Sequence, residues 1–150
     1  MSVAFRRESD EEHKEPRFEL PLPAGPNLVT ARGQALIDER IAALEAERPT
    51  ADEARAAEIA RELRYWVTRR ATAILAPPPP VDEVAFGSTV TFRLNGKEQR
   101  ITLVGDDEAE PAAGLVSFSA PLARAMIGAG EGELVAFNGR DDAIEILALG

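Results

Sequence analysis

Residues 89–104 read TVTFRLNGKEQRITLV, and this stretch decides the fold of the C-terminal half of the chain. Apolar and polar side chains alternate from Val90 to Leu94, which is the period of a strand with one buried face. Asn95-Gly96 comes next, a pair that favours the tight turn of a β-hairpin. Residues 100–104 then predict the return strand. The stretch therefore predicts two antiparallel, neighbouring strands.

The residues on both sides of this hairpin extend the pattern to a small domain. The same alternation predicts further strands at 84–86, 115–118, 133–138 and 143–149. A turn is expected at 139–141, before the last strand. Residues 121–127 predict a short amphipathic helix that ends at Gly128. Residues 84–150 are therefore expected to form one α+β domain, an antiparallel sheet with one short helix.

A helical pattern precedes this domain. Ile37, Ile41 and Leu44 are spaced four and three residues apart, which is the stripe of a helix packed on one side. Thr30 is a suitable N-cap for this helix. Pro49 is expected to end it, because the residue before a proline is pushed out of the helical region.

A second helix is predicted to start directly after this break. Thr50 and Glu53 have the T-x-x-E spacing of a capping box. The helix then carries apolar or aromatic residues at three- and four-residue spacings: Ile59, Leu63, Trp66, Val67 and Ile74. Because so short a break favours antiparallel neighbours, residues 28–76 predict a helical hairpin, a short antiparallel coiled coil. Trp66 is expected in its seam or in packing between domains.

Two proline-rich segments flank the predicted hairpin. Residues 1–27 mix charged side chains with four prolines, and each proline lacks an amide donor and restricts the residue before it. An extended N-terminal tail is therefore expected over 1–27. Residues 77–83 begin with four consecutive prolines, which favour a stiff polyproline spacer between the hairpin and the C-terminal domain.

The composition excludes several classes of function. The 150-residue chain has no cysteine and a single histidine, His13, which argues against zinc fingers, thiol nucleophiles and a Ser-His-Asp triad. No metal or other cofactor is therefore expected. No apolar run approaches the roughly 20 residues that span a bilayer, and the N-terminus lacks the apolar segment of a signal peptide. We expect a cytoplasmic protein that does not contact membranes.

The net charge of −9 is concentrated in the C-terminal half, since residues 77–150 contain five basic and twelve acidic side chains. A protein that binds nucleic acid normally needs a basic face to release counterions from phosphates. Sequence-specific binding to nucleic acid is therefore not expected. A basic patch on another protein is the more natural partner for such a field.

Four short motifs of the C-terminal domain resemble a known family. They are FGSTV at 86–90, VGDDEA at 104–109, SAPLARAMIG at 119–128 and Gly132-Glu133. In order and spacing they are similar to the C-terminal domain of the Gre transcript-cleavage factors, the GreA/GreB family. The resemblance covers residues 84–149, and the S-x-P-x-A-R-A string is its most specific part.

The resemblance implies an FKBP-like fold without isomerase activity. In the family this domain docks on the rim of the secondary channel of bacterial RNA polymerase, while a coiled coil N-terminal to it reaches toward the active site. The implied partner-binding residues are Asp106, Asp107, Glu108, Ser119, Pro121, Leu122, Arg124 and Met126. On composition alone the acidic run is better explained by a solvated loop, and the resemblance reverses that preference. Within the helical segment, Leu122 and Met126 are the better candidates for burial, and Arg124 for exposure.

The predicted tip of the hairpin departs from the family pattern. The cleavage factors carry a D-x-x-E tip in a Ser-Glu-Asn motif, whose carboxylates hold a second magnesium ion that activates water. Here residues 50–56 read TADEARA and the coil is much shorter, as in the Rnk relatives, which lack the cleavage tip. The carboxylates near this tip are Glu45, Glu47, Asp52 and Glu53. Adjacent helical residues point about 100° apart, so Asp52 and Glu53 are expected to stabilise the helix start and to hold no metal.

These observations favour a monomeric, non-enzymatic regulator that binds RNA polymerase at the channel rim and competes with cleavage factors. Two alternatives remain open. A true elongation factor that stimulates cleavage of backtracked RNA would need a carboxylate pair at the depth of the active site. An FKBP-like isomerase or chaperone would need an aromatic-lined pocket, whereas the C-terminal phenylalanines are expected in the core.

Overall fold

The computed structural model describes residues 19–150, which divide into two compact units. One unit holds Ile37–Thr72 together with the described residues up to Gly25. The other holds Pro26–Leu36 together with Ala73–Gly150. Most of the predicted tail at 1–27 lies outside the described residues.

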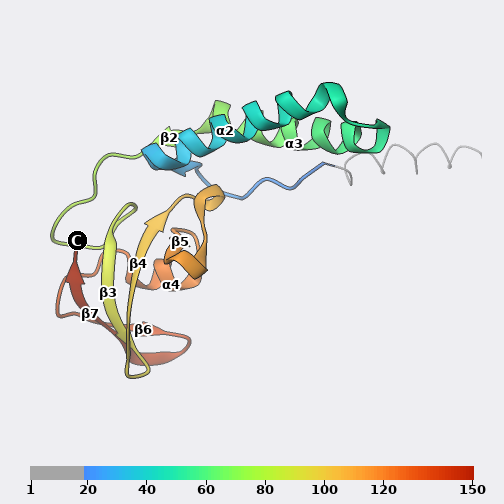
Figure 1. Cartoon of the computed structure of the whole chain (residues 1–150). Coiled ribbons are helices and arrows are strands. Elements are labelled where there is room, and N and C mark those ends of the chain that lie inside the picture. Colours follow the sequence, from blue (N-terminus) through green and yellow to red (C-terminus); the bar gives the residue numbers. More distant parts are fainter. Residues whose placement is uncertain (1–18) are drawn as a thin grey trace, which may run out of the picture. The chain divides into compact units, whose positions relative to one another are not determined.

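The first unit is built on a helical hairpin, as predicted. Helix α2 (Ala31–Glu47), whose first residues belong to the second unit, and helix α3 (Glu53–Thr72) lie side by side, joined through a 3-10 turn, η1 (Arg48–Thr50) (Figure 1). Five residues of the predicted stripes are buried: Ile37, Ile41, Leu44, Ile59 and Leu63. Trp66 is only half-buried and Val67 is exposed, so the second stripe was predicted too wide. At about 1.5 Å per residue, the two helices are roughly 26 Å and 30 Å long.

The two helix starts use different caps from one another. The backbone N–H of Gly33 donates to Thr30 Oγ1 at 2.9 Å, which confirms Thr30 as the N-cap of α2. The capping box predicted at Thr50 and Glu53 is wrong, because the N–H of Arg55 donates to Asp52 Oδ1 at 2.8 Å. Asp52 is therefore the N-cap of α3. Residues 48–50 form the 3-10 turn instead, because the chain must reverse before a second helix can start.

Helix α3 also ends earlier than the sequence pattern predicts. Ile74 was expected in the helical seam but lies in a strand, β2 (Ile74–Leu75), which pairs in parallel with β1 (Leu28–Val29). The N–H of Ile74 donates to the carbonyl of Asn27 at 2.9 Å, so its hydrogen bond is made outside any helix. Pro77 follows closely and disfavours a helical conformation at Ala76.

The C-terminal domain contains a five-stranded sheet in the order β5-β4-β3-β7-β6. Its strands are β3 (Thr89–Leu94), β4 (Lys97–Val104), β5 (Leu115–Ser117), β6 (Leu134–Phe137) and β7 (Arg140–Leu149). The hairpin β3–β4 is confirmed, and its turn at Asn95-Gly96 has φ values of 54° and 76°. Residues 84–86 were predicted as a strand and lie outside the sheet. The last turn is Asn138-Gly139, so β7 begins three residues earlier than predicted.

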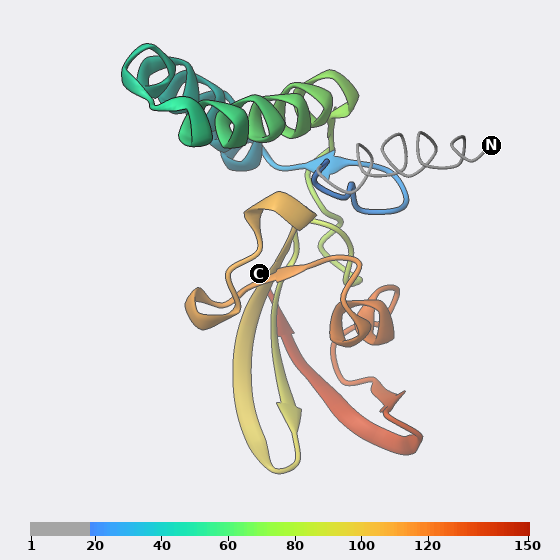
Figure 2. The same ribbon diagram turned by 90° about the vertical axis from the view of Figure 1, so that its right-hand side faces the viewer.

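The sheet is mixed, and the predicted purely antiparallel sheet is therefore wrong. Strands β4 and β5 are parallel, with Thr102 opposite Leu115 and Val104 opposite Ser117. The intervening loop folds through two 3-10 turns, η2 (Asp106–Glu108) and η3 (Pro111–Ala113), and then through Gly114 at φ 79°. These tight turns reverse the chain twice, so that β5 runs in the direction of β4 (Figure 2).

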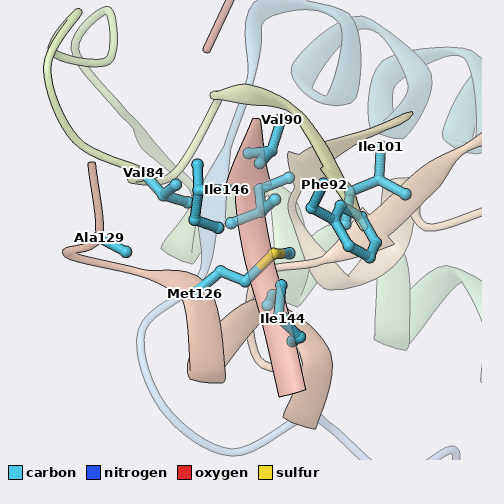
Figure 3. Packing of buried hydrophobic residues seen from close by; sticks show 10 residues of the cluster. Val84, Val90, Phe92, Ile101, Met126, Ala129, Ile144 and Ile146 are labelled. Atoms are coloured by element: carbon cyan, nitrogen blue, oxygen red, sulfur yellow. The ribbon is translucent and has the colours of Figure 1, made fainter. Parts of the chain in front are cut away.

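One face of the sheet packs on the short helix α4 (Pro121–Met126), which confirms the helix predicted there. Figure 3 shows Met126 of α4 pointing toward Ile144 and Ile146 of β7. All three side chains are fully buried, as is Phe92 of β3. This core holds the segments before and after β5 in place. Within residues 19–150, no helix has the length and apolar character needed to cross a membrane.

Candidate docking surface

The acidic turn η2 and the segment before α4 meet through one carboxylate. The hydroxyls of Ser117 and Ser119 both donate to Asp106 Oδ1, the second of them at 2.6 Å. The backbone N–H of Ser119 donates to Ser117 Oγ at 3.1 Å. Two of the family-like motifs, thirteen residues apart at these positions, are thereby joined in one polar cluster.

A pair of aromatic rings lies next to this cluster, since Phe118 stands between Ser117 and Ser119 in the chain. Phe118 packs edge-on against Phe86, with ring centroids 5.2 Å apart. The N–H of Phe118 donates to the carbonyl of Val104 at 2.9 Å. A third family-like motif, at 86–90, therefore contributes to the same region.

Six of the eight residues predicted to contact a partner are exposed or half-buried. Ser119, Pro121 and Arg124 are exposed, whereas the others are half-buried. We call the six residues the docking surface: Asp106, Asp107, Ser119, Pro121, Leu122 and Arg124. Met126 is fully buried, so its side chain supports the surface from below and does not reach a partner.

Glu108 has a different place from its acidic neighbours. Its side chain is only 4% exposed. It accepts hydrogen bonds from Thr30 Oγ1 at 2.6 Å and from the guanidinium of Arg32 at 2.8 Å. The direct contact predicted for Glu108 is therefore replaced by an internal one. We call Thr30, Arg32 and Glu108 the clasp.

Two glycines allow the clasp region to close. A Cβ atom on Gly33 would lie 2.7 Å from a carboxylate oxygen of Glu108. A Cβ atom on Gly105 would lie 2.4 Å from the backbone carbonyl oxygen of Leu28. Strand β1 and the first turn of α2 are thus fitted closely against η2. The sequence gives no local signal for the clasp, because Thr30 and Glu108 are 78 residues apart.

The four carboxylates predicted near the hairpin tip are engaged separately. Glu47 accepts two hydrogen bonds from Arg55, at 2.7 and 2.9 Å, and this contact lowers the pKa of Glu47. Asp52 caps α3, and Glu53 is the first residue of that helix. Glu45 lines a shallow groove on the side of the hairpin. Across the described part of the chain, no three acidic or histidine side chains gather as metal ligands would.

The comparisons with known proteins identify the C-terminal domain. Residues 79–149 match the family model "Transcription elongation factor, GreA/GreB, C-term". Transcription elongation factor GreB of Neisseria meningitidis is 39% identical over 99 residues, which are 61% of this chain and 60% of that protein. Transcription elongation factor GreA of Brucella abortus is 43% identical over 72 residues, 45% of this chain and 46% of that protein. The matched part thus spans less than two thirds of these relatives.

Among solved structures, the GreA factor homolog 1 (Gfh1) of Thermus thermophilus aligns with 84% of this chain and 99% of its own. The sequence identity is 12% and the TM-score is 0.40, so this similarity is too weak to support a conclusion. The segment matched by the family model includes all six residues of the docking surface. Residues 79–149 therefore match the C-terminal domain of the GreA/GreB family of Gre factors.

Proposed function

We propose that this chain is a transcription regulator that binds bacterial RNA polymerase at the rim of the secondary channel. It acts as a monomer in the cytoplasm, uses no cofactor and catalyses no reaction itself. Its C-terminal domain, FKBP-like in this proposal, docks through the docking surface. By occupying the channel entrance, the protein competes with cleavage factors.

The main support for this proposal is the hydrogen bond between Asp106 and Ser119, which brings two family-like motifs together. The relatives that match this segment are named transcription elongation factors. Asp106 and Asp107 remain partly exposed, and the side chains of Ser119 and Arg124 are exposed. Such a surface suits a charged protein partner, whose attraction steers encounter and weakens with salt.

The arrangement of the hairpin tip supports a non-catalytic role. A tip that delivers magnesium needs several oxygen ligands directed at one point. Here the carboxylate of Glu47 is held by Arg55, and that of Asp52 is bound to the backbone of α3. Both carboxylates are therefore engaged in structural hydrogen bonds at the tip.

An assay on backtracked elongation complexes tests the proposal directly. The full chain is added alone, and then in increasing amounts together with an active cleavage factor. We expect no RNA shortening by the chain alone and a dose-dependent loss of cleavage by the competitor. RNA shortening by the chain alone would establish the alternative, a true cleavage-stimulating factor. No effect in either format would contradict polymerase binding.

A charge-removal variant tests the docking surface. Asp106→Asn with Asp107→Asn is expected to weaken polymerase binding about tenfold, if each lost charge contact contributes roughly 0.7 kcal/mol. The matched control is Asp141→Asn with Asp142→Asn, which removes the same charge at the start of β7. At low salt the Asp106/Asp107 variant should bind polymerase more weakly than the control variant. At high salt the two variants should bind with equal affinity. Equal weakening by both would show that net charge, and no specific surface, governs binding.

A second variant tests whether Asp52 and Glu53 deliver a metal ion or only stabilise the start of α3. Asp52→Ser with Glu53→Gln removes both adjacent charges while serine keeps an N-cap acceptor for α3. Competition with the cleavage factor is expected to stay within about twofold of wild type, because no catalytic carboxylate is lost. The inhibition constant in the same assay checks this. If the wild-type chain shortened RNA and this variant bound polymerase but did not, the tip would have a catalytic part.

A further inference from the structure

Two hairpin turns of the C-terminal domain carry the same dipeptide. Asn95-Gly96 joins β3 to β4, and Asn138-Gly139 joins β6 to β7. Their φ values are nearly equal, 54° and 76° in the first turn and 53° and 78° in the second. All four residues are exposed. The chain thus repeats one local geometry at two places, both within the second unit.

An asparagine that precedes a glycine can react with the backbone. The glycine nitrogen forms a bond to Cγ of the asparagine and gives up its proton, while the side-chain amide leaves as ammonia. Water then opens the resulting succinimide ring at either carbonyl, which yields aspartate or isoaspartate. Glycine favours the first step because it has no side chain to obstruct the approach, and asparagine counts among the thermolabile residues.

The attacking nitrogen is available in both turns. Within residues 19–150, the N–H groups of Gly96 and Gly139 donate no hydrogen bond. A Cβ atom built on either glycine would meet nothing within 4 Å, so the space around each turn is open. The backbone therefore gives neither asparagine an advantage over the other.

The side chains of the two asparagines are held differently. Asn95 Oδ1 accepts a hydrogen bond from Arg140 Nη1 at 2.8 Å, which links the ends of the two hairpins (Figure 2). Asn138 makes no side-chain hydrogen bond to any part of the chain that the structure describes. Reaction requires the side chain to swing onto the following amide, so Asn95 must first lose its contact with Arg140. Asn138 has no such contact to lose.

We propose that Asn138 is a site of spontaneous modification, where succinimide formation converts the residue to isoaspartate and aspartate, and that Arg140 protects Asn95 from the same reaction. Asn27, the third asparagine of the chain, is buried and precedes a leucine.

The modification changes the edge of the sheet. Either product adds a negative charge three residues before Asp141, next to which Asp142 is also acidic. Isoaspartate also lengthens the backbone by one carbon atom within the turn that sets the register of β6 and β7. Because β6 is an edge strand, its pairing with β7 is the only pairing it can lose. The reaction therefore weakens the attachment of β6 as the protein ages.

Peptide mapping of the native full chain tests the proposal. The protein is incubated at mildly alkaline pH in water enriched in heavy oxygen, so that each ring opening labels the new carboxyl group for mass spectrometry. We expect label at Asn138 to accumulate about fivefold faster than at Asn95, the ratio that corresponds to one net hydrogen bond of about 1 kcal/mol. No label at Asn138, or a rate no greater than that at Asn95, would overturn the proposal.

The chain unfolded in guanidinium chloride controls for sequence. Each Asn-Gly pair is followed by a basic residue, Lys97 or Arg140, so the two rates should agree within about twofold once the fold is lost. A fivefold ratio that persisted in the unfolded chain would assign the difference to sequence, and would overturn the protective part of the proposal.

Arg140→Ala tests the protecting contact itself. The variant should raise the rate at Asn95 about fivefold and leave the rate at Asn138 within about twofold of wild type. Arg100→Ala is the matched control, because it removes the same charge from another exposed strand position and should change neither rate. An unchanged rate at Asn95 in Arg140→Ala would show that the hydrogen bond gives no protection. Because polymerase is absent from these measurements, their outcome leaves the proposed function untouched.

Discussion

Gly105→Ala is expected to lower the free energy of unfolding by about 2–3 kcal/mol, the upper range for overpacking a close-fitted site. Gly105 has φ −72°, which any residue adopts, so the loss does not come from backbone conformation. It comes from the added Cβ atom, which would lie 2.4 Å from the carbonyl oxygen of Leu28. Backbone cannot rotate away as a side chain can, so β1 or η2 must move.

The movement is expected in strand β1 and its pairing with β2. Val29 of β1 accepts a hydrogen bond from the N–H of Ala76 at 3.1 Å, and Asn27 accepts one from Ile74. Displacing β1 from Gly105 strains this two-stranded sheet. Urea unfolding gives the stability change, and hydrogen exchange should rise in the segments 27–30 and 73–76. Ala109→Ser is the matched control, because it adds one atom to an exposed position of the same loop and should change stability by less than about 0.5 kcal/mol. A similarly small change for Gly105→Ala would mean that the close approach is not rigid.

The elements that the sequence predicts correctly are those fixed by neighbouring residues. The β3–β4 hairpin follows from alternation around Asn95-Gly96, and α4 from its short amphipathic pattern. The hairpin seam follows from Ile37 and Ile41, both buried as their spacing predicts. Each of these patterns is complete within one segment, so no distant partner is needed to recognise it.

The errors arise where a distant partner decides the local structure. Ile74 continues the helical stripe, yet its amide binds Asn27, nearly fifty residues earlier. Strand β5 shows the same alternation in either direction, so only the path of the preceding loop makes it parallel to β4. Propensity is a weak prior in both cases and tertiary pairing overrides it.

The docking surface could be predicted only in part for a related reason. The family-like motifs single out Asp106 and Ser119, and the structure brings them together through Ser117. Nothing in the acidic run distinguishes Glu108 from the residues before it. Its burial depends on Thr30, the N-cap of α2, and on Arg32 in the first turn of that helix.

Glu108→Ala is expected to destabilise the protein by about 2 kcal/mol, since hydrogen bonds to a buried charged group typically contribute 1.5–3 kcal/mol. The variant removes the acceptor for both Thr30 and Arg32. Arg32 is 60% exposed and can return to solvent, so the loss is smaller than for a fully buried pair. Glu110→Ala, an exposed carboxylate two residues on, is the matched control and should change stability by less than about 0.5 kcal/mol.

A double-mutant cycle with Gly33→Ala identifies the contact responsible for this loss. In the wild-type chain the new Cβ atom would lie 2.7 Å from the Glu108 carboxylate, so Gly33→Ala should bring no gain in stability or a loss. In the Glu108→Ala background that obstacle is absent, and the same change should stabilise the protein by about 0.5–1 kcal/mol, as glycine replacement in a compatible conformation does. Urea unfolding of the four proteins gives the coupling energy, expected to be about 1 kcal/mol. Additive effects would show that Glu108 does not fit against the first turn of α2, and the clasp would then have no energetic role. A measured coupling would mean that the start of α2 and the acidic turn η2 are held together by the buried carboxylate of Glu108.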